Sequence, residues 1–171
     1  MIKHKLLSLF VALIATTSLW ASNTITYTAS AKLSETTSSS GSGLHTNAFN
    51  VSISSHTFSN GTGTIICKGE ITTIGERAFY SCEGLTSVTI PNSVTTIGDR
   101  AFYNCMGLIL VTINSNAICS KTYSSYSTIG NIFGSQVKEY IIGDSVTTIG
   151  SFAFYNCKGL TSVTIPNSVT T

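Results

Sequence analysis

A segment of 23 residues repeats along the second half of this 171-residue chain. Residues 85–107 read LTSVTIPNSVTTIGDRAFYNCMG, and residues 137–159 read VKEYIIGDSVTTIGSFAFYNCKG. Residues 62–84 keep this frame with a weaker first half, and residues 160–171 begin another copy that stops at Thr171. A repeat of roughly 20–29 residues is typical of a solenoid, in which each unit buries its apolar side against the next. The period therefore restricts the fold more than any other feature.

Each unit begins with a strand pattern. Leu85, Val88 and Ile90 are apolar and predict an inward face, whereas Ser87 and Thr89 alternate with them and are expected to point outward. Stacked strands of this kind predict one parallel sheet over a shared core. The 26 serine and 26 threonine residues of the chain agree with strands whose hydroxyls face water.

The second half of each unit predicts a turn and a short helical segment. Pro91 and Asn92 should turn the chain, and Asp99 should begin a helical turn that carries Phe102 inward. Gly107 is then expected to end the turn in the left-handed conformation. Gly84 and Gly159 occupy the same phase. We therefore predict a β-rich leucine-rich-repeat solenoid, with one parallel sheet and short helical turns or irregular structure opposite it.

One unit, residues 108–136, is irregular because it has 29 residues. Its extra residues fall around Cys119–Ser127, which are rich in serine and tyrosine. Extra residues in a repeat normally form a loop on one face, and that face often binds a partner. The alternative is a neutral surface loop, since loops tolerate insertion at little free-energy cost.

The residues before the repeats divide into two segments. Residues 1–21 have a basic start, an apolar run too short to span a bilayer, and small residues before Ala21, so they predict a secretory signal peptide. Residues 22–61 predict an N-terminal β cap on the solenoid, with a strand over 25–33, a flexible Ser/Thr/Gly-rich loop and a second strand over 51–58. Asn60 and Gly61 predict a hairpin turn into the first repeat. A small separate binding module is the alternative for residues 22–61.

The repeat motif also resembles a known family. The phrases TIPNSVTTIGDRAFYNC and DSVTTIGSFAFYNCKGL are similar to the BspA-like leucine-rich repeats of bacterial surface proteins, over residues 62–171. The resemblance implies a secreted or cell-surface bacterial protein that takes part in adhesion to host matrix proteins or cells. The irregular unit departs from the family pattern, so a uniform curvature is not implied.

Function on a solenoid normally lies on the surface that its stacked strands create. Three apolar residues interrupt the expected outward ladder of hydroxyls, and the patch would suit a protein or glycan partner. Tyr123 and Tyr126 on the loop are natural contacts at its edge, because aromatic residues are enriched at interfaces. The alternative is that Ser and Thr are simply good strand residues on a wet face. The predicted sheet-face residues are Thr64, Ile66, Ser87, Thr89, Leu110, Thr112, Glu139, Ile141, Ser162 and Thr164.

The sequence offers little for catalysis, and we expect no enzyme activity and no cofactor. His45 and His56 have no metal-ligand spacing, so no metal site is expected. His56 and Cys67 flank one hairpin and could approach each other, but no nucleophile motif supports them. Three cysteines share one repeat phase, which predicts a buried thiol ladder or a disulfide between the first two. These are Cys82, Cys105 and Cys157.

Charge and the chain end bear on partners. After removal of Lys3 and Lys5 with the signal peptide, seven basic residues (9 − 2) balance seven acidic residues, so no footprint for nucleic acid is present. No later segment is apolar enough to cross a membrane. The repeat stops before its expected Ile-Gly, which predicts a fragment of a longer protein or an end-to-end association through an uncapped end. A non-binding spacer between other domains is the alternative function.

Overall fold

The computed structural model describes residues 23–38 and 41–170, so the predicted signal peptide lies outside the described residues. Within these described residues, thirteen short elements follow one another. The strands and helices are β1 Thr24–Ala29, β2 Glu35–Thr36, β3 Leu44–His45, β4 Ile53–Ser59, β5 Thr62–Cys67, β6 Thr73–Ile74, β7 Leu85–Ile90, β8 Thr96–Ile97, β9 Leu110–Ile113, α1 Asn116–Cys119, α2 Ile129–Phe133, β10 Glu139–Ile142 and β11 Ser162–Thr164.

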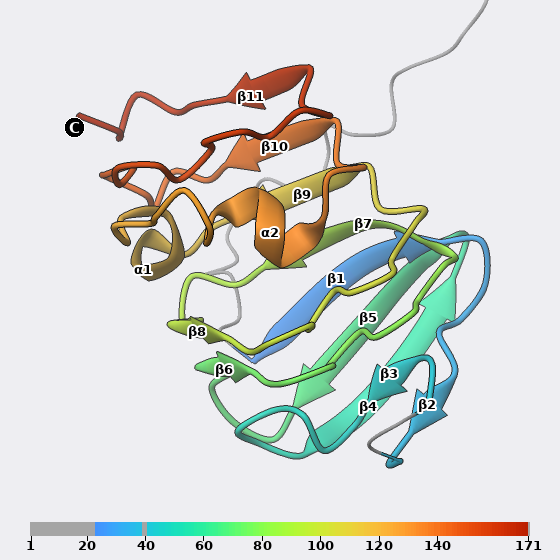
Figure 1. The fold of residues 1–171 in the computed structure, drawn as a ribbon. Helices are drawn as coiled ribbons and strands as arrows, with labels where there is room; N and C mark the ends of the chain where they lie inside the picture. The colour runs from blue at the N-terminus through green and yellow to red at the C-terminus, as the bar shows by residue number, and fades with distance from the viewer. Residues whose placement is uncertain (1–22, 39–40, 171) are drawn as a thin grey trace, which may run out of the picture.

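A seven-stranded sheet forms one layer, and turns with the two short helices form the other (Figure 1). The strand order is β11-β10-β9-β7-β1-β5-β4. Strands β7, β9, β10 and β11 are parallel, each at the same place in its repeat, which confirms the β-rich repeat solenoid. The layer of turns and helices, here called the turn layer, covers the inner face of the sheet.

The cap strand β1 lies inside the sheet and does not cover its end. It pairs antiparallel with both β5 and β7, so it separates the strands of the first two repeats, and the expected single parallel sheet is interrupted there. The inward side chain of Tyr27 has room between the two strands because its partner on β5 is Gly63. Any larger residue there would clash, since a Cβ at position 63 would lie 1.9 Å from the Tyr27 ring. In the turn layer the same two repeats remain adjacent, since β6 pairs with β8. The sheet layer is therefore one strand, about 4.8 Å, longer than the turn layer.

The predicted hairpin is confirmed between β4 and β5. Asn60 has φ 50° and Gly61 has φ 77°, the two positive values that the favoured two-residue hairpin turn requires. Strand β4 thereby forms the edge of the sheet.

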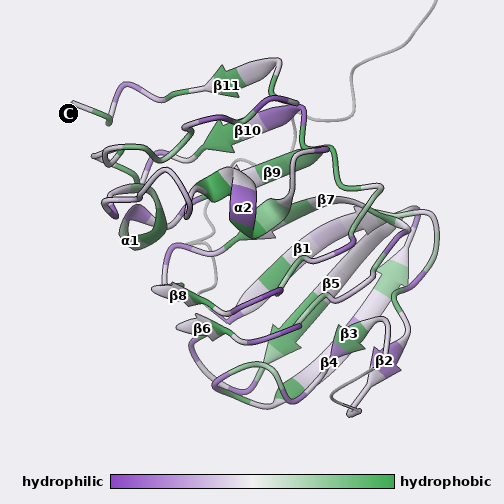
Figure 2. Ribbon diagram, in the orientation of Figure 1, coloured by the Kyte–Doolittle hydropathy of each residue, from purple (hydrophilic) through white to green (hydrophobic). Residues whose placement is uncertain are grey.

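A stack of aromatic rings runs through the core along the solenoid axis. Phe49 of the cap contacts Phe79 edge to face, with ring centroids 6.1 Å apart. Phe79 stacks on Phe102 at 4.9 Å, and Phe102 lies 4.8 Å from Phe133. Phe79, Phe102 and Phe133 come from the same phase of successive units, so stacking of the repeats also stacks these rings. Figure 2 shows hydrophobic segments recurring along the strands and turns that enclose this core.

The turns of the regular units differ from the prediction. No helix begins at Asp99, and Gly107 does not have positive φ; instead Arg100 (φ 52°) and Asn104 (φ 59°) adopt the left-handed conformation. Gly107 is required for a different reason, since a Cβ there would lie 2.5 Å from the carbonyl oxygen of Glu83 in the preceding unit. The repeated glycine thus allows close approach of neighbouring backbones. The equivalent left-handed positions in other units are Arg77, Ser81, Phe152 and Asn156.

A ladder of serine hydroxyls joins successive units. Ser93 donates to the carbonyl of Ile71 at 2.7 Å, and Ser168 donates to that of Val146 at 2.8 Å. Ser115 and Ser145 do the same to Val94 and Asn114. Because each bond satisfies a backbone acceptor between units, these serines contribute to the solenoid rather than to a wet face.

Candidate functional site

All ten predicted sheet-face residues lie on the outward side of the sheet. Two rows cross the parallel strands in register. One row holds Ser87, Leu110, Glu139 and Ser162, and the other holds Thr89, Thr112, Ile141 and Thr164. Thr64 and Ile66 lie beyond β1, which separates them from these rows.

Strand β1 supplies residues that the sequence analysis missed. Thr26 lies between Thr64 and Thr89, so it makes the second row continuous across the inserted strand. The hydroxyls of Thr28 and Ser87 are 2.7 Å apart. The buried alternation of Ile25, Tyr27 and Ala29 already indicated outward threonines, but no sequence pattern indicated that this strand would lie between two repeats.

The outward side chains are only partly open to solvent, apart from Ile66 and those at the last strand. Ser87, Thr89, Leu110, Thr112, Glu139 and Ile141 are half-buried, whereas Ser162 and Thr164 are exposed. Ile66 is 36% exposed and is the most open of the three apolar intrusions. The face is therefore a tightly spaced array of small hydroxyls with three isolated apolar side chains.

The two loop tyrosines differ in exposure, and the prediction that Tyr123 contacts a partner is wrong. Tyr126 is 91% exposed, but Tyr123 is 5% exposed and donates its hydroxyl to the carbonyl of Ile118 at 2.8 Å. The ring of Tyr123 is buried because the loop folds back over the core. The loop also joins α1 to α2 in the turn layer, so neither tyrosine lies at the edge of the outward sheet face (Figure 1).

His56 does not pair with Cys67. Its Nε2 atom lies 2.7 Å from the hydroxyl of Tyr27, and its Nδ1 atom lies 2.8 Å from the carboxylate of Glu35. The hydrogen bond from His56, and then that from Lys32, lowers the pKa of Glu35, while burial raises the pKa of Tyr27. Since Tyr27 is 1% exposed, this chain of bonds fastens β1 to β4 and to the segment that carries Glu35.

Four of the five cysteines lie in an environment that disfavours the thiolate, whereas the hydrogen bond with Cys82 lowers the pKa of Cys105. All five cysteines are free, so Cys82 and Cys105 form no disulfide in this structure. Cys82 and Cys105 are buried, as the predicted thiol ladder requires, whereas its third member, Cys157, is half-buried. Cys67 and Cys119 are also buried. Burial raises the pKa of Cys119 to about 12 and also raises those of Cys67 and Cys157. Contact with Cys105 together with burial raises the pKa of Cys82. Thiols held neutral in this way are poor nucleophiles at neutral pH.

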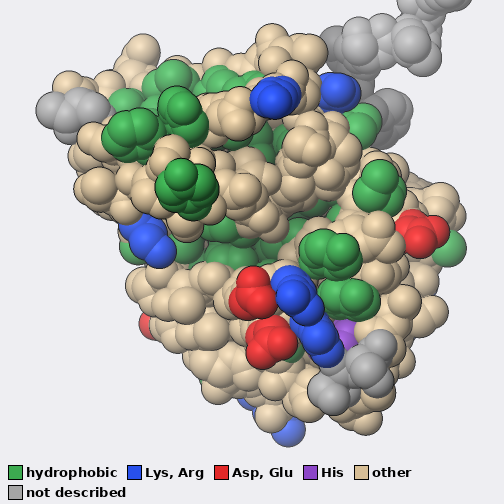
Figure 3. Space-filling view, in the orientation of Figure 1, with side chains coloured by type: hydrophobic (Ala, Val, Ile, Leu, Met, Phe, Trp, Pro, Cys, Tyr) green, Lys and Arg blue, Asp and Glu red, His purple; other side chains and the backbone are tan. Residues whose placement is uncertain are grey.

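Within residues 23–38 and 41–170, no three His, Cys, Asp or Glu side chains gather closely enough to hold a metal ion. The two short helices in the same part of the chain could not span a bilayer. On the face in Figure 3, charged side chains gather in small groups on a surface that is mostly uncharged.

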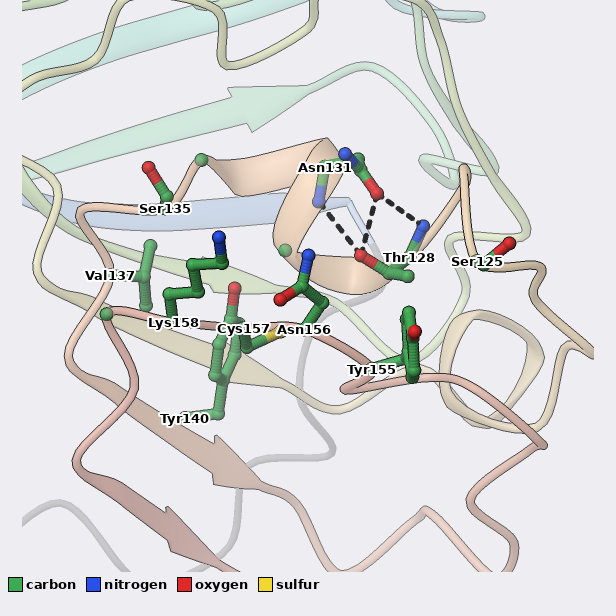
Figure 4. Close-up of a pocket in the computed structure, with 13 residues that line it drawn as sticks. Ser125, Thr128, Asn131, Ser135, Val137, Tyr140, Tyr155, Asn156, Cys157 and Lys158 are labelled. Carbon is green, nitrogen blue, oxygen red and sulfur yellow. Dashed lines mark hydrogen bonds between the residues drawn. The ribbon is translucent and has the colours of Figure 1, made fainter.

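The turn layer contains a pocket that the sequence analysis did not predict, here called the Tyr140 pocket (Figure 4). It lies between α2 and the last turns of the repeat formed by residues 137–159. Its volume is about 390 Å³, within the range of roughly 300–1,000 Å³ that is typical of ligand sites. The hydroxyl of Tyr140 is buried and has no hydrogen-bond partner among the described residues. Such a group costs about 1–3 kcal/mol when unsatisfied. The pocket is lined by Ser125, Thr128, Gly130, Asn131, Gly134, Ser135, Val137, Tyr140, Tyr155, Asn156, Cys157, Lys158 and Gly159.

Comparison with known proteins agrees with the stacked units. The family model described as "BspA type Leucine rich repeat region" matches six copies over residues 51–171. The chain belongs to the BspA-type leucine-rich-repeat family. The match begins at residue 51, so it includes β4 of the segment expected to form the cap, and it counts one copy more than the five units expected from residue 62.

One solved structure similar to this BspA-type chain is a leucine-rich repeat protein from Bacteroides ovatus ATCC 8483. The two are 22% identical, with a TM-score of 0.31. The similarity covers 81% of this chain and 41% of that protein, so this chain spans less than half of its length. No curated protein matches the chain.

Proposed function

We propose that this chain is a secreted or surface-attached bacterial recognition module whose outward sheet face binds a protein or glycan of a host matrix or cell. BspA-type repeats are in general interaction modules and occur typically in bacterial surface or secreted proteins, which supports this proposal. The family and its fold are generally non-enzymatic, and the four thiols of raised pKa and the hydrogen-bonded His56 favour binding over catalysis.

The observation that carries the proposal is the register of the outward hydroxyls. Thr64, Thr26, Thr89 and Thr112 lie directly opposite one another on four neighbouring strands. Neighbouring strands are about 4.8 Å apart, so the row repeats at that spacing. Threonine is stiff at χ1, and an array of stiff side chains has little rotamer freedom to lose when a partner binds.

The three apolar residues give this array specific positions. Ile141 is opposite Thr112, and Leu110 is opposite both Ser87 and Glu139. Ile66 lies opposite Thr24 at the other side of the face. An interface with isolated apolar contacts within a field of hydroxyls suits a polar partner better than an apolar peptide.

The test replaces the three apolar side chains together. We expect Ile66→Lys, Leu110→Lys and Ile141→Lys in one variant to weaken binding to immobilised extracellular-matrix extract and to cultured host cells at least about tenfold, because buried unpaired charge opposes association. Surface plasmon resonance and cell adhesion would measure the loss, with circular dichroism to check the fold. Met106→Lys, at an exposed residue of the turn layer, is the matched control.

Unchanged adhesion of the folded triple variant would show that the sheet face is not the binding site. The alternative function, a spacer that binds nothing, predicts no measurable binding by the unmodified chain. In that case its contribution would be the separation of other domains.

A further inference from the structure

Two substitutions in the repeat pattern line the Tyr140 pocket. In the turn layer, Tyr80, Tyr103 and Tyr155 occupy one phase, and Gly134 stands where the irregular unit would have a tyrosine. Tyr80 and Tyr103 stack with centroids 5.4 Å apart, so the row is continuous until it reaches Gly134. One ring is therefore missing from the stack between Tyr103 and Tyr155. Tyr155 is 49% exposed and lines the pocket.

The second substitution is Tyr140 itself. Its neighbours in register on β9 and β11 are Val111 and Val163, so a tyrosine replaces valine in an inward row. The longer side chain extends past Phe133 and Phe154, whose rings it contacts edge to face. Figure 4 shows its hydroxyl end pointing toward the side chains of Lys158 and Asn156. The unpartnered hydroxyl is thus placed at the base of the pocket.

The remaining lining consists of polar side chains, three glycines, Val137 and Cys157, and its one charged side chain is that of Lys158. Lys158 forms no ion pair among the described residues, and no acidic side chain lines the pocket. The Oδ1 atom of Asn131 accepts from Thr128, which fixes this amide in place (Figure 4). Ser135 and Asn156 add further polar groups. The pocket therefore offers an aromatic wall, one cation and several hydrogen-bonding groups.

We propose that the Tyr140 pocket binds a sugar ring that bears a carboxylate, such as a uronic or sialic acid residue of a glycan. The ring packs on Tyr155, next to the Gln136 side chain, which occupies the position that a side chain at Gly134 would take. The carboxylate lies near Lys158, and a sugar hydroxyl satisfies Tyr140. The amides and hydroxyls of the lining, of which Asn131 and Thr128 hold each other in place, match the many hydroxyls of a sugar better than they match a peptide carboxylate. The site lies in the turn layer, opposite the outward sheet face, so this inference does not depend on the proposed function.

The experiment measures binding of small glycosides to the chain by saturation-transfer NMR and calorimetry. We expect methyl β-glucuronide or the methyl glycoside of N-acetylneuraminate to bind saturably and at least about tenfold more tightly than methyl β-glucoside, because a hydrogen bond to a charged group is the stronger kind. Lys158→Gln should remove that preference. Tyr140→Phe should weaken binding severalfold while leaving the melting temperature unchanged or raised, because it deletes an unsatisfied hydroxyl and keeps the packed ring.

Lys138→Gln, which changes a lysine outside the pocket, is the matched control and should bind like the unmodified chain. Absence of saturable binding of both acidic glycosides would overturn the proposal. So would equal binding of the neutral glucoside, or acidic-sugar binding that neither pocket variant changes. Acetate that competes as well as the glucuronide would show that the pocket recognises charge alone, which also contradicts a sugar site.

Discussion

The second and third repeats, residues 85–107 and 108–136, share one half and differ in the other. Both begin with a strand, and β7 and β9 pair in register from Ser87 to Ile90. Both place a phenylalanine in the aromatic stack, Phe102 and Phe133. Their turn layers are different, because the second repeat uses turns with left-handed residues, whereas the third contains α1, a loop and α2.

The difference shows which parts of the repeat the stacking determines. Strands and ring positions must match their neighbours on both sides, so they cannot vary independently. The outer turns contact solvent, and lengthening a loop adds only about 0.6 kcal/mol for each doubling of its length. The third repeat therefore accommodates six additional residues (29 − 23), and it is also the repeat beside which the Tyr140 pocket forms.

The largest predicted effect tests the shared half. Phe102→Ala and Phe133→Ala should each lower the free energy of unfolding by about 3–5 kcal/mol, because both rings are fully buried and leave a cavity. Urea denaturation followed by circular dichroism would measure the two losses. Similar values would support the view that the irregular repeat retains the same core as the regular one.

The control for this pair is Phe152→Ala. Phe152 is 52% exposed and lies in the turn layer, so its loss should be much smaller. A small effect of Phe133→Ala alone would contradict the shared aromatic stack and would mark the third repeat as loosely attached.

The next effect tests the half that differs. In the third repeat, Thr128 is the N-cap of α2 and accepts a hydrogen bond from the backbone of Asn131 at 3.3 Å. Thr128→Ala should therefore lower the free energy of unfolding by about 1 kcal/mol, and Thr128→Ser should retain most of it.

In the second repeat, Asn104 has a left-handed backbone. Asn104→Ala should lower the free energy of unfolding by about 1 kcal/mol because of this conformation, and Asn104→Gly should not. Thermal unfolding of the four variants would separate a cap from a strained turn. If Asn104→Ser were as stable as Asn104→Gly, the left-handed backbone would not be the cause of the loss in Asn104→Ala.

The period and the apolar positions were sufficient to predict the solenoid, its parallel strands and the outward face. They follow from local alternation and from stacking, both of which are visible in one unit. The place of β1 was not predictable in this way, because Ile25, Tyr27 and Ala29 specify a strand but not its neighbours. Its position depends on Gly63 giving room to Tyr27 across 36 residues of chain (63 − 27).

The pocket and the serine ladder show a second limit. Gly134 and Tyr140 are visible departures from the repeat, but their meaning depends on the space between two layers. Serine and threonine predicted a wet face, yet Ser93 and Ser115 bond to buried carbonyls because their phase places them between units. Residue type alone does not distinguish these roles.

The smallest effect compares the two tyrosines of the loop. Tyr123→Phe should lower the free energy of unfolding by about 1 kcal/mol, since it removes the hydrogen bond to the carbonyl of Ile118, whereas Tyr126→Phe should change it by less than about 0.5 kcal/mol.

Burial also raises the pKa of Tyr123 from its ordinary 10.0 to about 12. The unfolded chain then loses its proton first, so the contribution of Tyr123 to stability is intact below pH 10 and declines as the pH rises toward 12. Tyr123→Phe should make that alkaline decline shallower in pH-dependent denaturation, and Tyr126→Phe should not. Equal alkaline profiles for the two variants would mean that the loop does not hold Tyr123 in the core, and that the third repeat is open where the second is closed.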